Sequence, residues 1–95
     1  MADLMQEKLA KLLGDAQKAH HDYETTELEG VFDEQWPQWY ADFLVANGFA
    51  DLLAIQPDLD ELASRLSEIS QRHKAERVDQ PWAEYTARNL VESYI

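Results

Sequence analysis

Apolar residues recur every three or four positions over most of this sequence, which is the spacing of helices that bury one face. Over residues 3–25 these recurring positions are Met5, Leu9, Leu12, Ala16, Ala19 and Tyr23. Over residues 58–77 they are Leu59, Leu62, Leu66, Ile69 and His73. Both segments are therefore predicted to be helices that turn a seam of apolar side chains toward the rest of the molecule.

A shorter helix with sharply defined ends is predicted within residues 33–48. Asp33 is its expected N-cap, and Pro37 suits its first turn, where a missing backbone N–H costs nothing. Gly48 suits its end, because glycine adopts the left-handed conformation that closes many helices. The apolar stripe of this segment consists of Trp36, Trp39, Tyr40, Phe43, Leu44 and Ala46. So much aromatic surface is expected to form the centre of the core.

Two further helical segments are predicted in the second half of the chain. Residues 49–56 are apolar but stop at Pro57, so they predict one or two helical turns. Residues 81–93 follow the break at Pro81 and are predicted to form the last helix.

The predicted helices are joined by short connections, and this determines the expected fold. Val31 and Phe32 are expected to pin the connection between the first two helices to the core. No stretch shows the alternation that is typical of strands. The sequence therefore predicts an all-α protein, a single acidic domain over residues 1–95. We expect a small bundle of about four helices in up-down-up-down order, with a short extra helical turn near residues 49–56.

The charge of the chain is unevenly distributed, and its net value is -11 at pH 7. Residues 19–64 contain no lysine or arginine, but they contain 11 acidic residues. The other 8 acidic residues are balanced by 8 lysines and arginines, so the whole net charge lies in this middle part. Direct nucleic-acid binding is not expected, because phosphate contacts need clustered basic side chains. A basic protein partner or a cation fits better, and a solvated acidic surface that aids solubility needs no partner at all.

Several classes of protein are disfavoured by composition. The chain has no cysteine, which excludes disulfides, thiolate catalysis and cysteine-based zinc sites. It has no apolar run of membrane-spanning length and does not start like a signal peptide, so a soluble, cytoplasmic protein is expected. It also has no glycine-rich phosphate loop and no serine in a nucleophile elbow. The sequence therefore offers no catalytic residues, and it leaves the question of enzymatic activity open while favouring a protein that is not an enzyme.

One candidate site follows from the expected helix order. In an up-down-up-down bundle, the ends of the first and third helices meet the starts of the second and fourth. This order would bring His20, Glu24 and His73 beneath a group of aromatic side chains, namely Trp36, Trp39, Tyr40, Tyr23 and Trp82.

Three interpretations of this cluster remain open. His20, Glu24 and His73 could bind a divalent metal such as zinc, iron or nickel. A small organic or anionic ligand could instead stack on the aromatic side chains. In the third interpretation no cofactor is bound, and both histidines are hydrogen-bonded residues at the edge of the core, below an aromatic cap.

The sequence favours a small acidic helical module that acts by binding. Its partner would be a basic protein surface, or a second copy joined in a homodimer through the seam of residues 3–25. The alternative is a small-ligand or divalent-metal-binding protein, with its site at the end that carries Trp36, Trp39, His20 and His73. A nucleic-acid mimic, which occupies a DNA-binding protein through its acidic face, ranks third.

Overall fold

Five helices and no strand occur in residues 2–30, 33–77 and 79–94, which are the residues that the computed structural model describes. The helices are α1 (Ala2–Thr26), α2 (Trp36–Ala46), α3 (Phe49–Leu53), α4 (Leu59–Ala75) and α5 (Trp82–Tyr94). The all-α class, the small bundle and the short extra helix after residue 48 are therefore confirmed. Val31 and Phe32, which were expected to pin the connection before α2, lie outside the described residues.

The ends of the helices coincide with the residues that favour them. Pro37 stands in the first turn of α2, where no intrahelical donor is lost. Gly48 has a φ of 107°, which lets the chain leave α2 and begin α3 at once. Asp58 is the N-cap of α4, and its side chain accepts the backbone N–H groups of Asp60 and Glu61.

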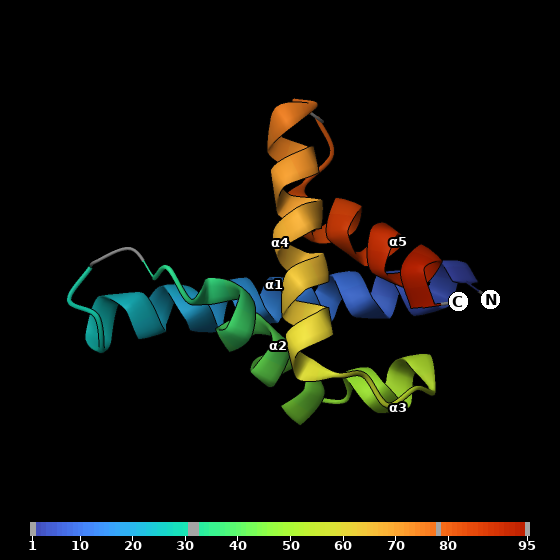
Figure 1. The fold of residues 1–95 in the computed structure, drawn as a ribbon, viewed down its shortest axis with the longest axis horizontal. Coiled ribbons are helices and arrows are strands. Elements are labelled where there is room, and N and C mark those ends of the chain that lie inside the picture. The colour runs from blue at the N-terminus through green and yellow to red at the C-terminus, as the bar shows by residue number, and fades with distance from the viewer. Residues whose placement is uncertain (1, 31–32, 78, 95) are drawn as a thin grey trace.

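The longest helix forms the base on which the others pack (Figure 1). At about 1.5 Å per residue, the 25 residues of α1 extend over most of the 40 Å length of the molecule. In the figure, α5 lies beside the N-terminal half of α1, and α2 lies beside its C-terminal half. The helix α4 contacts α2 and α5, and α3 packs against α1 and α2.

The direction of α4 was not predicted, because the expected helix order implied that α4 runs alongside α1. In Figure 1 this helix runs across α1 instead of alongside it, so the two helices diverge toward their ends. The α4 helix packs mainly on α2 and α5, which lie between it and α1, so it is not held parallel to α1. The α4 helix therefore packs over the middle of the molecule, where it can reach both α2 and α5.

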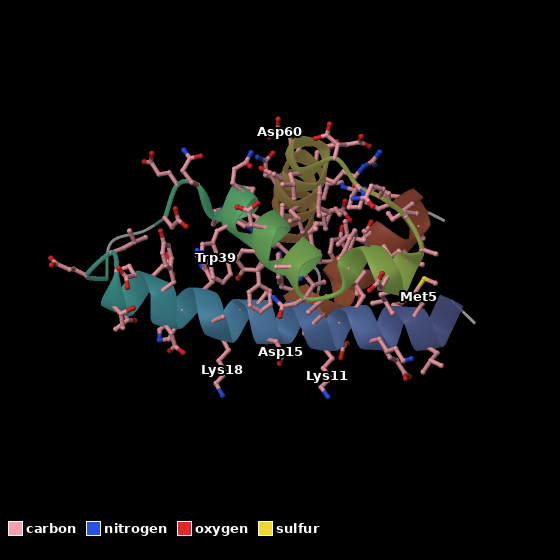
Figure 2. The ribbon with its side chains drawn as sticks, turned by 90° about the horizontal axis from the view of Figure 1, so that it is seen from below. Met5, Lys11, Asp15, Lys18, Trp39 and Asp60 are labelled. Atoms are coloured by element: carbon pink, nitrogen blue, oxygen red, sulfur yellow. The ribbon has the colours of Figure 1, made fainter. Side chains whose placement is uncertain are left out.

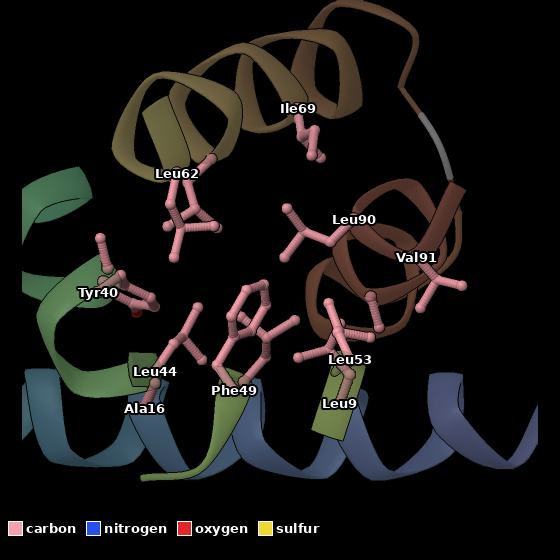
Figure 3. Packing of buried hydrophobic residues seen from close by; sticks show 14 of the residues in the cluster. Leu9, Ala16, Tyr40, Leu44, Phe49, Leu53, Leu62, Ile69, Leu90 and Val91 are labelled. Atoms are coloured by element: carbon pink, nitrogen blue, oxygen red, sulfur yellow. The ribbon is translucent and has the colours of Figure 1, made fainter. Parts of the chain in front are cut away.

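One hydrophobic core joins all five helices (Figure 3). Phe49 of α3 is fully buried among side chains of the other helices, including Leu9, Leu44 and Leu90. Leu59, predicted to start the seam of α4, is an exception, since it is 41% exposed. It is the first residue of the helix and is flanked at the surface by exposed aspartates. None of the described helices combines the length and apolarity needed to cross a lipid bilayer.

Candidate functional site

A buried pair of polar side chains, His20 and Asp33, joins the C-terminal part of α1 to the segment that precedes α2. The Nε2 atom of His20 lies 3.0 Å from the Oδ2 atom of Asp33. The two residues are only 7% and 9% exposed. Buried polar groups are tolerated when each has a partner, so this contact fixes where the connection crosses α1.

Asp33 also organises the backbone ahead of α2. Its Oδ1 atom accepts the N–H of Gln35 at 2.9 Å, and its carbonyl oxygen accepts the N–H of Trp36 at 3.3 Å. The N-cap position itself is held by Gln35, which makes no side-chain cap hydrogen bond. The prediction that Asp33 is the N-cap was therefore wrong by two residues. Its side chain closes the preceding turn because His20 holds it there.

Glu24 completes this arrangement from the last turns of α1. Its Oε2 atom accepts the backbone N–H of Asp33 at 3.1 Å, and its Oε1 atom lies 3.7 Å from Nδ1 of His20. His20 and Glu24 are therefore neighbours, as their spacing of one helical turn predicted. The imidazole stands between two carboxylates, one from α1 and one from the connection.

Aromatic rings cover this polar group. The ring centroid of His20 lies 4.8 Å from that of Trp39, 5.1 Å from Tyr40 and 6.1 Å from Tyr23. Trp39 points from α2 toward α1 (Figure 2) and stacks on Phe43 at 5.4 Å. His20 is thus a hydrogen-bonded residue below an aromatic cap.

A cleft of about 230 Å³ opens beside this cap. It is lined by Gln17, His20, Trp36, Tyr40, Ser70 and Trp82. Three of the five aromatic residues predicted to bind a ligand therefore share one cleft. The other two, Tyr23 and Trp39, pack against His20 and against each other and do not line it.

His73 has a different environment from His20. Its Nε2 atom lies 2.8 Å from the carbonyl oxygen of Gln80, and its ring centroid lies 4.9 Å from that of Tyr85. It joins the end of α4 to the start of α5. Among the described residues, no three His, Cys, Asp or Glu side chains are arranged to hold a metal ion. The structure thus brings His20 to Glu24 but not to His73, because α4 crosses α1.

The comparisons with known proteins assign no family. No family model, curated protein or solved structure shows a significant match to this chain. The function is therefore argued from the cleft, the polar group beneath it and the charged surface.

Tyr40 should make the stability of the protein depend on alkaline pH. Burial and the nearby carboxylate of Glu24 raise the pKa of Tyr40 from 10.0 to about 12. Between these values the unfolded chain loses the phenolic proton while the folded protein keeps it, so the free energy of unfolding falls as the pH rises. Urea titrations at about pH 9 and pH 12 measure how much free energy of unfolding is lost between these pH values. This loss should be about 2 kcal/mol larger in the wild type than in Tyr40→Phe.

The phenylalanine variant is a clean reference because the Tyr40 ring remains and no hydrogen bond of its hydroxyl is found in the described structure. At about pH 9 the two proteins should differ little in stability. Equal losses in both proteins between the two pH values would show that the Tyr40 hydroxyl ionises as easily in the folded state as in the unfolded state.

Proposed function

We propose that this protein is a small acidic helical interaction module that binds a basic surface of another protein. The supporting observation is that most acidic side chains of residues 19–64 have no ion-pair partner within the described chain. Glu24 and Asp33 face His20, and Glu61 pairs with Arg65 at 2.7 Å. The eight others are all exposed: Asp22, Glu27, Glu29, Glu34, Asp42, Asp51, Asp58 and Asp60.

Basic side chains of α1 lie on the other side of the molecule from the acidic side chains at the start of α4. Lys11 and Lys18 project from the outer face of α1, whereas Asp60 stands on the opposite side of the molecule (Figure 2). Charges separated by more than the Debye length of about 8 Å at physiological salt are largely screened from one another. The acidic surface therefore keeps its negative potential, which attracts and orients a positively charged partner.

A different protein is a better partner than a second copy of this one. The α1 seam that would have joined a homodimer is used within the chain, where Leu9 and Ala16 are fully buried. Two copies would also bring like charges together, since each carries a net charge of -11. Complementary charge on the partner removes this repulsion.

Two variants test the proposal by removing the same number of negative charges from different parts of the molecule. Glu27, Glu29 and Glu34 are replaced together by glutamine in one variant, and Glu7, Glu76 and Glu92 in the other. All six are exposed, so both variants should keep the helix content of the wild type. Affinity for a lysine- and arginine-rich peptide, measured by titration calorimetry, should fall roughly fivefold in the first variant and little in the second.

The salt dependence of binding gives a second readout. Affinity of the wild type should fall steeply with ionic strength, and the first variant should show a shallower slope. Equal effects of the two triple variants would mean that only total charge matters, and the proposed acidic surface would not be a binding site.

A further inference from the structure

Three aromatic rings in the cleft stand nearly at right angles to one another. Trp36 and Tyr40 meet at 84°, Tyr40 and Trp82 at 82°, and Trp36 and Trp82 at 76°. Their centroids are 5.4, 5.4 and 6.3 Å apart in the same order. All three line the cleft, two from the first residues of α2 and α5 and one from the middle of α2. The three rings meet edge to face at one corner of the cleft.

Such a corner suits a compact cation. The face of an aromatic ring carries partial negative charge and attracts cations within about 6 Å of its centroid. A small, nearly spherical cation in such a corner can approach more than one ring, whereas a planar guanidinium group stacks on one. Trimethylation of an ammonium keeps its charge and reduces the hydration that it must give up on entering the cleft.

The residues that line the cleft are also compatible with a cation. The residues that line it include no lysine or arginine, and the one titratable base, His20, lies 3.0 Å from Asp33 and 3.7 Å from Glu24. The positive ends of the α2 and α5 dipoles oppose a cation. Acidic residues accompany both of these ends, Asp33 and Glu34 before α2 and Glu84 in the first turn of α5.

We infer that this cleft receives the ammonium group of a lysine side chain from the basic partner, and that it holds the group more tightly when the lysine is trimethylated. The inference rests on the proposed function, because the acidic surface supplies the attraction that brings a basic segment to the cleft. The half-buried rings of Trp36 and Trp82 then supply selectivity for one residue of that segment.

A series of synthetic peptides tests this assignment directly. Each peptide alternates arginine and alanine and carries one central residue: lysine, trimethyllysine, or the uncharged tert-butyl isostere of trimethyllysine. Titration calorimetry should give the order trimethyllysine, then lysine, then isostere. Trimethyllysine should bind about threefold to thirtyfold more tightly than the isostere of the same shape.

Two tryptophan variants test whether the preference for trimethyllysine arises in the cleft. Trp82→Leu removes one wall of the cleft, and Trp39→Leu removes a half-buried tryptophan that does not line it. The preference for trimethyllysine should disappear in Trp82→Leu and persist in Trp39→Leu, with circular dichroism confirming that both are folded. The comparison of peptides on the wild-type protein uses no variant, so it tests the inference even if a variant fails to fold.

The possible outcomes separate the inference from the proposed function. Equal affinity for trimethyllysine and its isostere would overturn the cation site, while binding that weakens with salt and with the Glu27, Glu29 and Glu34 substitutions would still support the acidic module. A preference that survives in folded Trp82→Leu would also overturn the site. Absence of binding to every peptide would contradict both.

Discussion

Replacing Phe49 by alanine is expected to lower the free energy of unfolding by about 3–5 kcal/mol. Phe49 is fully buried, and its side chain stands where α1, α2 and α5 face one another (Figure 3). Its ring also meets that of Tyr94 at 5.9 Å. The cost combines lost burial with the cavity left among fixed neighbours. Because small domains are stable by only about 5–15 kcal/mol, urea denaturation followed by circular dichroism should show a large shift of the midpoint.

Two further substitutions serve as controls for Phe49→Ala. Phe43→Ala removes the same side chain from α2, but Phe43 is only half-buried, so it should cost clearly less. Phe49→Leu keeps most of the apolar volume and should recover much of the stability lost in Phe49→Ala. Equal costs for Phe43→Ala and Phe49→Ala would show that the five-residue helix α3 is not anchored in the core.

Most of the helices could be predicted because their signals are local. Pro37, Gly48 and Asp58 act on the backbone within one turn, so their effects do not depend on the rest of the fold. Phe49 shows the opposite case. Its segment was predicted only as one or two helical turns, and nothing in this short sequence indicates that the ring of Phe49 would be fully buried where α1, α2 and α5 face one another.

The direction of α4 and the candidate site depended on tertiary structure. His20 and Glu24 could be paired from sequence because they share one helix face. The contact of His20 with Asp33 spans 13 positions and crosses a connection without periodic structure, so no sequence pattern marks it. His73 was assigned to the same site only because α1 and α4 were expected to run side by side. The mutual angles of Trp36, Tyr40 and Trp82 likewise depend on how α2 and α5 are placed in the tertiary structure.

Asp33→Ala is expected to be the most damaging substitution of a polar residue in this region, at about 2–4 kcal/mol of unfolding free energy. The change leaves the buried Nε2 of His20 and the N–H of Gln35 without their acceptor. Asp33→Asn keeps one acceptor oxygen for the N–H of Gln35 and places an NH2 donor toward Nε2 of His20, which accepts it in the other tautomer of the ring, so it should cost less. Urea denaturation of the two variants measures the difference.

A double-mutant cycle then isolates the energy of the contact between His20 and Asp33. His20→Ala in the Asp33→Ala background should cost less than His20→Ala in the wild type, because the partner is already gone. Glu61→Ala provides the surface reference: its exposed pair with Arg65 should contribute at most about 1 kcal/mol. A cost of Asp33→Ala no larger than that of Glu61→Ala would mean that His20 does not hold the connection in place.

The local effect of Asp33→Ala should extend to the cleft. The backbone carbonyl of Asp33, which the substitution keeps, accepts the N–H of Trp36, so a shift of the chain at position 33 is passed on to the residue that begins α2 and forms one wall of the aromatic corner. Freed from His20, this part of the chain is held to α1 by fewer contacts, and the angle between Trp36 and Trp82 is no longer fixed. Folded Asp33→Ala should therefore lose selectivity between trimethyllysine and its isostere, yet keep the salt-dependent attraction of basic peptides to its remaining exposed carboxylates.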